Sequence, residues 1–294
     1  MKHILLFLLM ALMPLGASAA TKAKANQPAS WWRMGRNYFD GANGKPQDDA
    51  QAVKWFTKAA EAGYPQAEYD LAYCYEYGYG IDKDESQATV WYWMSAKHGN
   101  VQGMNATGYR FEHGIGIEKD LDRAFYWYCQ AGKKWDAWAL NALGRCYQYG
   151  LGVEKNFNTA FFYYKSSADK GNSDAQSNMG YCWEHGLGTD AIPSYAAELY
   201  QKSTDQGNAT GQFNLALLYD KGKGVVQNKA KAFHLFKLSA AQDNAAAQYN
   251  VGRYYENGLG GASQDRDEAF EWYRKAASNG NKDAQKALER LCAE

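Results

Sequence analysis

One tetrapeptide of the sequence has the spacing of a catalytic nucleophile. Ser167-Ala168-Asp169-Lys170 matches the S-x-x-K signature of penicillin-binding proteins, in which the serine hydroxyl attacks a β-lactam. The companion motifs S-D-N and K-T-G do not follow it in this sequence. Ser167 is therefore a weak candidate for acyl transfer, and the repeat pattern described below explains both residues without catalysis.

Two glutamate–histidine pairs carry side chains that can bind a metal. Glu112-His113 and Glu184-His185 occupy equivalent positions of the same repeat, two copies apart. Stacked helical units are separated by roughly 10 Å each, whereas metal–ligand bonds are about 2 Å long. The pairs are too distant to share one metal, and a solvated polar face explains them better. Because C-x-x-C, P-loop, dinucleotide, G-x-S-x-G and H-E-x-x-H motifs are also missing, the sequence predicts no cofactor and no metal.

The charge balance argues against a nucleic-acid partner. The 294 residues include 32 basic and 32 acidic side chains, and no long cluster of Lys and Arg stands out. Nucleic-acid affinity rests on neutralising phosphates, so this composition does not favour it. Five prolines are few, which suits a helical protein, and the 29 glycines must be explained by their positions.

The N-terminus has the pattern of a secretory signal peptide. A short basic start, Met1-Lys2-His3, precedes the apolar run 4–15, and small residues follow up to Ala20. Twelve apolar residues are too few for a membrane-spanning helix, which takes about 20. We expect residues 1–19 to be a signal peptide cut after Ala19 or Ala20, and residues 20–29 to be a flexible lead-in. The mature protein is then exported without membrane insertion, to the periplasm in the simplest case or to the outside.

A repeat of 36 or 37 residues runs through residues 30–294. Its copies start near residues 30, 67, 103, 139, 175, 211 and 247, and a half-copy starts near 284. A glycine recurs twelve residues or so into each copy, and an alanine recurs about ten residues later. The glycines are Gly41, Gly78, Gly114, Gly150, Gly186, Gly222 and Gly258, and the alanines are Ala52, Ala88, Ala124, Ala160, Ala196, Ala232 and Ala269.

Each copy predicts two helices. The first carries one apolar stripe, and a Gly-x-Gly sequence ends it because glycine adopts the left-handed conformation without strain. A small residue in its centre, such as Gly144, predicts the close approach of another helix. The second helix starts at an Asp or Asn that can cap it and carries an aromatic or aliphatic pair, such as Tyr163-Tyr164. The capping residues are Asp48, Asp84, Asp120, Asn156, Asn228 and Asp265, with Ile192 as the exception.

These patterns predict an all-α protein. We expect a right-handed α/α superhelical solenoid of about seven 36-residue helix–turn–helix repeats plus a C-terminal capping helix, with the first helices lining its concave side. The pattern Ala-x3-Leu-Gly-x2-Tyr-x2-Gly-x-Gly, seen at Ala139, Leu143, Gly144, Tyr147 and Gly150, resembles the Sel-one-like repeat (SLR) family, a relative of tetratricopeptide repeats. The resemblance covers residues 30–294. It implies a protein–protein interaction scaffold and, for secreted bacterial members, a role in the envelope, in stress or in contact with host cells.

The five cysteines allow one candidate disulfide. Cys74, Cys146 and Cys182 share one repeat position, where stacking places helix axes roughly 8–10 Å apart, too far for a bridge between Cα atoms under about 7 Å apart. Cys129 and Cys146 lie on consecutive antiparallel helices at similar distances from the turn between them. They form the candidate bridge in an oxidising compartment, with buried thiols as the alternative.

The side of the first helices opposite the apolar stripe is the candidate partner-binding groove. Its members are Tyr73, Tyr77, Tyr109, His113, Arg145, Tyr149, Tyr181, His185 and Arg253. Tyrosine and arginine give strong contacts at a low cost in ordering. The alternative is that these aromatics pack between repeats. Asn178, Asn214 and Asn250 form a ladder that either holds an extended peptide or bonds within the stack, whereas Trp55, Trp91, Trp127 and Trp272 are expected in the core.

The sequence favours a non-enzymatic, monomeric scaffold that binds a protein or peptide through its concave face. One alternative is an envelope enzyme or enzyme regulator acting on peptidoglycan or β-lactams. The second alternative is a glycan-binding protein, because stacked Tyr and Trp also suit sugars. A protein partner would be captured by crosslinking, whereas a glycan reader would bind purified sacculi.

Overall fold

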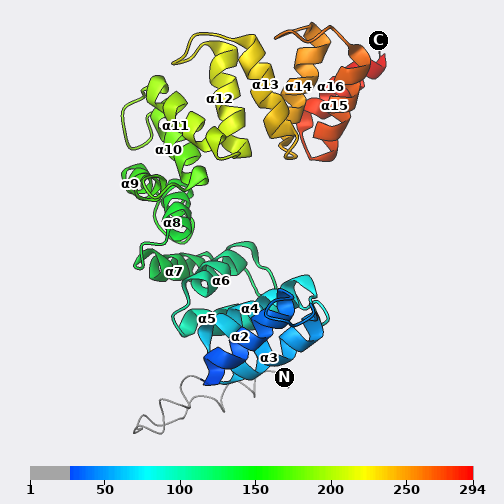
Figure 1. Cartoon of the computed structure of the whole chain (residues 1–294). Helices are drawn as coiled ribbons and strands as arrows, with labels where there is room; N and C mark the ends of the chain where they lie inside the picture. The colour runs from blue at the N-terminus through cyan, green and yellow to red at the C-terminus, as the bar shows by residue number, and fades with distance from the viewer. Residues whose placement is uncertain (1–26, 294) are drawn as a thin grey trace. The chain divides into compact units, whose positions relative to one another are not determined.

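The structure, a computed structural model, describes residues 27–293 and divides into two compact units, residues up to Lys119 and residues from Asp120. The predicted signal peptide lies outside the described residues. Within residues 27–293 every regular element is an α-helix and none is a strand (Figure 1). The predicted all-α helical repeat solenoid is therefore confirmed.

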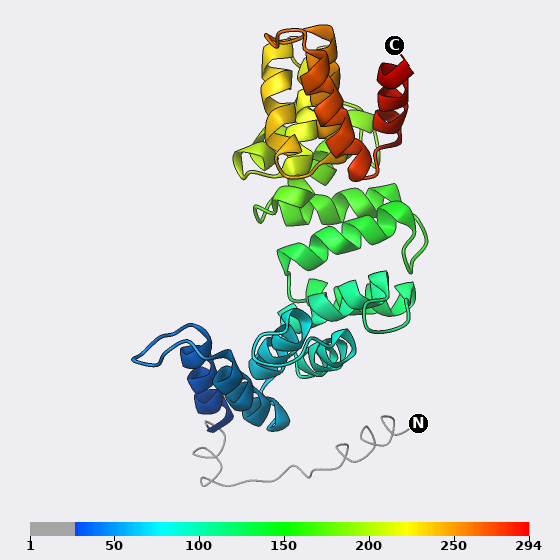
Figure 2. The ribbon, with the colours of Figure 1, turned by 90° about the vertical axis from the view of Figure 1, so that its right-hand side faces the viewer.

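The first unit contains the first two repeats and the start of the third. Its helices are α2 (Gln27–Phe39), α3 (Asp49–Glu61), α4 (Pro65–Tyr77), α5 (Glu85–Lys97) and α6 (Val101–His113). The connection between α2 and α3, where the first repeat departs from the glycine spacing, extends as a loop away from both helices (Figure 2).

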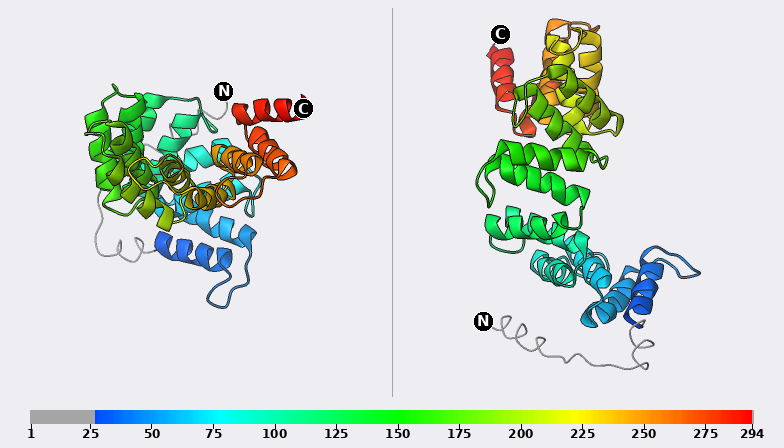
Figure 3. Two further views of the ribbon diagram at one scale, coloured as in Figure 1. Left: turned by 90° about the horizontal axis from the view of Figure 1, so that it is seen from above. Right: turned by 90° about the vertical axis from the view of Figure 1, so that its left-hand side faces the viewer.

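The second unit completes the third repeat and adds four more and a capping helix. The cap α16 packs on α15 (Figure 3). The helices of this unit are α7 (Leu121–Gly132), α8 (Ala137–Tyr149), α9 (Phe157–Ala168), α10 (Ser173–His185), α11 (Pro193–Asp205), α12 (Ala209–Lys221), α13 (Lys229–Ala240), α14 (Ala245–Asn257), α15 (Arg266–Ser278) and α16 (Lys282–Ala293).

Helix ends follow the capping residues that the sequence predicts. The side chain of Asn156, for example, accepts a 3.0 Å hydrogen bond from the amide of Thr159 at the start of α9. At the exception, Ile192 makes no such bond and Pro193 occupies the first turn of α11. The turns after α7 and α13, where glycine is replaced by Trp135 and Asp243, still adopt the left-handed conformation, with φ of 56° and 58°. The geometry of the repeat thus outweighs the preference of these two non-glycine residues for negative φ.

The core lies between the two helices of each repeat. The recurring alanine of the second helix is buried in every repeat, and so is the second residue of the aromatic or aliphatic pair. Those residues are Phe56, Tyr92, Tyr128, Tyr164, Tyr200, Phe236 and Tyr273. The expectation for the tryptophans needs correction, because Trp127 is buried whereas Trp55, Trp91 and Trp272 are only half-buried. The first residue of the pair covers the edge of the core, and the second fills it.

Glycines make room for close contacts at two places in a repeat. A Cβ on Gly144 would lie 2.5 Å from the ring of Tyr164, so the small residue of the first helix makes room for the buried ring of the second. A Cβ on Gly152, which has a φ of 66°, would lie 2.1 Å from the carbonyl oxygen of Leu121 in the preceding repeat. The glycine loop of one repeat thus packs directly on the start of the previous second helix. Across residues 27–293, no helix combines the length and apolar character that crossing a bilayer requires.

Candidate partner-binding surface

The predicted groove residues lie on the exposed side of the first helices, which we call the first-helix face. In the first unit Tyr77 is 55% exposed, and Tyr109 and His113 are also exposed, whereas Tyr73 is half-buried. In the second unit Tyr149 is 63% exposed. Tyr181 and His185 are exposed there as well, and Arg145 and Arg253 are half-buried. Six of the nine side chains therefore face solvent rather than filling the space between repeats.

Most of these aromatic rings form pairs one helical turn apart. The ring centroids are separated by 4.5 Å for Tyr73 and Tyr77, and by 4.3 Å for Tyr109 and His113. Tyr181 and His185 repeat the second arrangement at 4.3 Å in the second unit. Residues four apart are neighbours on a helix surface. Each pair therefore presents one preformed aromatic surface.

In the first unit the tyrosine pair belongs to a larger cluster. Tyr79, in the loop between the two glycines that end α4, stacks on Tyr73 with ring centroids 5.8 Å apart. Phe39 of α2 meets the edges of Tyr73 and Tyr79 at 6.4 and 5.7 Å. Phe39 and Tyr79 lie outside the groove positions that the repeat pattern predicts. The signal that could have found Tyr79 is its aromatic ring between two turn glycines.

In the second unit the first-helix face contains a small polar hollow. It measures about 180 Å³ and is lined by Asn141, Arg145, Asp174, Ser177, Asn178 and Thr210. Asn178 donates a 2.9 Å hydrogen bond to the side-chain oxygen of Asn141, and Asn250 donates to the carbonyl of Ala246. Of the two readings of the asparagine ladder, these bonds favour hydrogen bonding within the stack.

A column of acidic and amide residues recurs beside the first-helix face and has a structural role. Its members are Glu76, Glu112, Gln148, Glu184, Asp220 and Glu256. The hydroxyl of the buried tyrosine in the second helix donates to them within the same repeat, from Tyr92 to Glu76 at 2.6 Å and from Tyr200 to Glu184 at 3.1 Å. In the α12–α13 repeat the tyrosine is replaced by Phe236, and Asp220 instead accepts from Tyr254 and pairs with Lys229. These hydrogen bonds explain why a polar column recurs next to the core.

The negative charge of Glu76 acts on Tyr77 of the exposed face. Glu76 raises the pKa of Tyr77, and partial burial and the neighbouring Tyr73 raise it further. Tyr77 is therefore a neutral hydrogen-bond donor and acceptor at physiological pH. The surface that it offers combines an aromatic ring with a hydroxyl.

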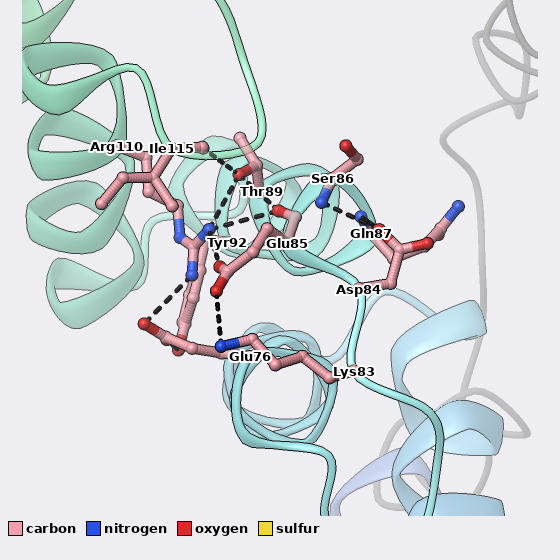
Figure 4. Close-up of polar contacts among 10 residues, drawn as sticks. All are labelled: Glu76, Lys83, Asp84, Glu85, Ser86, Gln87, Thr89, Tyr92, Arg110 and Ile115. Atoms are coloured by element: carbon pink, nitrogen blue, oxygen red, sulfur yellow. Dashed lines mark hydrogen bonds and ion pairs between the residues drawn. The ribbon is translucent and has the colours of Figure 1, made fainter.

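A buried arginine holds Glu76 in place. Arg110 of α6 is 2% exposed, and its Nη2 lies 3.1 Å from Glu76 Oε1 (Figure 4). Its Nη1 donates to the carboxylate of Glu85 at 3.0 Å and to the hydroxyl of Thr89 at 3.0 Å, and its guanidinium lies over the ring of Tyr92. Burial alone would raise the pKa of Glu85, but hydrogen bonds from Lys83 and Arg110 outweigh it and lower the pKa.

Sequence reasoning missed Arg110. It occupies the repeat position that Cys74, Cys146 and Cys182 hold in other copies. A charged residue in a column that is otherwise uncharged is the signal that could have found it, because a buried charge needs a partner. The arginine joins α6 to α4 and α5 of the preceding repeat.

The weak catalytic candidate has a structural role as well. Ser167 is 0% exposed, and its hydroxyl donates a 2.6 Å hydrogen bond to the carbonyl of Ala137 at the start of α8. Ser95, Ser203 and Ser239 make the same bond in their own repeats, 30 residues along the chain in each case. A hydroxyl enclosed in this way does not meet a substrate. The structure therefore gives no support to acyl transfer at Ser167.

The two glutamate–histidine pairs that were considered as metal ligands do not form a metal site. His113 and His185 lie 3.9 Å from the glutamates that precede them, Glu112 and Glu184. Within residues 27–293 no group of three or more His, Cys, Asp or Glu is arranged to hold a metal ion.

The same residues contain all five cysteines and no disulfide, so the structure does not contain the Cys129–Cys146 bridge. Cys129 is half-buried and Cys146 is buried, and burial raises the pKa of the Cys129 thiol.

Comparison with known proteins identifies the repeat. The Sel1 repeat family matches residues 31–64, 65–100, 101–134, 139–172, 173–208, 209–244 and 245–281. None of the curated proteins compared matches the chain.

Two solved structures share the fold over most of the chain. One is a protective antigen present in uropathogenic Escherichia coli strains that displays an SLR fold. It is 33% identical with a TM-score of 0.72, and the match covers 92% of this chain and 58% of the antigen. The other is a Sel1 repeat protein from Oxalobacter formigenes, 28% identical with a TM-score of 0.71, over 92% of this chain and 77% of that one. The chain thus spans little more than half of the E. coli relative. With seven matched repeats and these relatives, the chain belongs to the Sel1 repeat family.

Proposed function

We propose that the protein is an exported, non-enzymatic interaction scaffold that binds a partner protein or peptide through its first-helix face. Sel1 repeat proteins are generally protein-interaction scaffolds. The observation that carries the proposal for this chain is the set of exposed aromatic side chains on that face, with Tyr77, Tyr109 and Tyr149 as its most prominent members. Aromatic rings that are held in place before binding lose little entropy on contact, so they can contribute much of an interface's affinity.

The setting that we propose is the cell envelope or the contact with a host. The N-terminal sequence supports export, since it has the basic start, apolar run and small residues of a signal peptide. The similar E. coli protein described as a protective antigen supports the same setting. Cell fractionation with N-terminal sequencing tests export. We expect a mature chain that begins at Ala20 or Thr21 in the periplasm or the medium, and a cytoplasmic protein that retains Met1 would contradict it.

The binding surface is tested by crosslinking the mature protein in its native compartment and identifying partners by mass spectrometry. Tyr109→Ala combined with Tyr149→Ala should remove the partners that wild type captures. The matched control is Tyr126→Ala combined with Phe162→Ala, because these rings are 54% and 56% exposed but lie on second helices.

Three results would contradict the proposal. One is equal capture by wild type and the tyrosine variant, since the first-helix face would then make no contact. Another is retention on purified sacculi without any protein partner, which would indicate a glycan reader. Loss of capture in both double variants would also contradict it, because the effect would then not be specific to the first-helix face.

A further inference from the structure

A second hollow in the second unit is lined mainly by residues of second helices, and none of its lining residues belongs to the first-helix face. It has a volume of about 460 Å³ and lies between α11 and α13, whose positions are marked in Figure 1. Its lining includes Gln201, Tyr219, Asn228, Lys231, His234 and Leu235. Sites that hold small molecules measure roughly 300–1,000 Å³. The hollow is therefore large enough for a ligand group.

The lining of this hollow is basic. It contains a lysine and a histidine and no carboxylate. The helix that supplies them, α13, carries Lys229, Lys231, His234 and Lys237 and no acidic residue. Lys229 is paired with Asp220, whereas the ammonium of Lys231 lies 5.2 Å from the ring centroid of Tyr219 in the hollow. The local field therefore favours an anion.

Both lysines near the start of α13 stand where the helix dipole disfavours a positive charge. The N-terminal end of a helix carries a partial positive charge that favours acidic side chains and anions. Second helices α3, α5, α7 and α15 have Asp or Glu in the first turn, whereas α9, α11 and α13 have none. A negative group in the hollow would relieve the repulsion between Lys231 and the helix start.

The adjacent repeats show that the repeat pattern alone produces neither the open volume nor the basic lining of the α11–α13 hollow. In the preceding repeat, Trp183 and Tyr195 stand at the positions of Tyr219 and Lys231, and their rings meet edge to face at 5.2 Å. In the following repeat, Glu268 and Glu271 stand at the positions of Lys231 and His234. The α11–α13 hollow thus differs from one neighbour by being open and from the other by the sign of its charge.

We propose that this basic hollow binds an acidic side chain from a segment of a partner protein. The ammonium of Lys231 pairs with the carboxylate, and the imidazole of His234 donates a hydrogen bond. Asn228 uses its side-chain oxygen to cap the amide of Lys231, which leaves its amide hydrogens as further donors. Tyr219 and Leu235 pack against the methylene groups of the bound side chain. The hollow is independent of the first-helix face, so either surface can function without the other.

A labelled hexaglutamate peptide tests the proposal with the full mature chain. Fluorescence anisotropy should show binding of hexaglutamate that weakens as salt rises, and hexalysine should not bind at this site. Lys231→Glu and His234→Glu install the residues that the next repeat carries at the same positions, so the fold should tolerate them. Lys231→Glu should weaken binding by about fivefold or more.

The control is Lys286→Glu, which makes the same change of charge on the exposed side of α16. It should leave binding of hexaglutamate within about twofold of wild type. Circular dichroism must show the same helix content in all variants. The proposal is overturned if hexaglutamate does not bind wild type, or if Lys231→Glu and Lys286→Glu weaken binding equally, because net charge alone would then explain the effect.

Discussion

The hydroxyl of Tyr164 donates a 2.6 Å hydrogen bond to the side-chain oxygen of Gln148, sixteen residues earlier in the chain. Both residues are buried, and the bond joins the two helices of one repeat. Equivalent bonds join Tyr92 to Glu76, Tyr200 to Glu184 and Tyr273 to Glu256. The polar column thus satisfies the hydroxyl of these four buried tyrosines.

Removing this hydroxyl should destabilise the repeat although the ring remains. In Tyr164→Phe the oxygen of Gln148 stays buried without its donor, which costs about 1–2 kcal/mol of unfolding free energy. The midpoint of urea unfolding measures the loss. Tyr163→Phe is the control, because this ring is only half-buried and stacks on Tyr147. Equal midpoints for the two variants would contradict a stabilising role for the Tyr164 bond.

Replacing the buried arginine should cost more. Arg110→Leu leaves the carboxylates of Glu76 and Glu85 without their shared cation. Breaking a fully buried pair costs about 3–5 kcal/mol. We expect about 2 kcal/mol here because both glutamates keep contact with solvent. Chemical unfolding of the full chain measures the change.

A second substitution checks that the lost charge causes this effect. Adding Glu76→Gln to Arg110→Leu should recover part of the stability, since one of the two unpaired charges disappears. Leucine fits this repeat position, where Leu218 stands in α12. If the double variant is no more stable than Arg110→Leu, lost packing rather than lost charge explains the effect.

One repeat contains an ionisable pair where others have amides. The carboxylate of Glu68 lies 2.8 and 2.9 Å from Nδ1 of His98, whereas Gln206 donates to Gln176 and Gln242 to Gln212 at the same place in later repeats. Burial raises the pKa of Glu68, against the lowering effect of the hydrogen bond and charge of His98. The folded protein thus holds the Glu68 proton more tightly than the unfolded chain.

Stability should therefore depend on pH through Glu68. A raised pKa contributes stability that is complete below the ordinary value of about 4.5 and is lost as pH rises through the folded pKa. Compared with wild type, Glu68→Gln combined with His98→Gln should gain stability as pH rises from 4.5, measured by urea midpoints across the range. Gln176→Glu combined with Gln206→His should introduce the same dependence elsewhere. Parallel pH curves for wild type and the first variant would refute this prediction.

The cysteines should differ sharply in reactivity. Burial raises the pKa of the Cys74 and Cys182 thiols to about 12, and Cys292 is exposed on the last helix. Thiolates are the reactive form, so at pH 8 a thiol reagent should modify Cys292 first in the folded protein. Unfolding without reduction should release five reactive thiols, in agreement with the structure. A count of three in protein purified from an oxidising compartment would show that the Cys129–Cys146 bridge forms there.

The repeat, its helices and their ends could be predicted from the sequence because each rests on a local rule. Capping by Asp48 or Asn156 and the glycine turns recur at fixed spacing, so one copy explains the others. The position of Tyr149 on an exposed face also follows from helical periodicity. These predictions required no knowledge of how one repeat meets the next.

The contacts between side chains could not be predicted in this way. The Arg110 network depends on residues from three helices, and Ser167 is a structural donor only because Ala137 lies opposite it. The sequence places the acidic and amide column beside the binding face but does not reveal its partners, and in the structure Gln148 is buried and bonded to Tyr164. Spacing in one helix does not reveal which polar group a neighbouring helix offers.

The bond from Ser167 to Ala137 and the bond from Tyr164 to Gln148 both start and end within one 36-residue hairpin. Loss or duplication of a whole hairpin therefore breaks neither kind of bond, and only the seam between neighbours must be remade. Length can change in steps of a hairpin while every remaining copy stays internally complete. A binding surface assembled from such parts can lengthen or shorten in evolution without redesign of its interior.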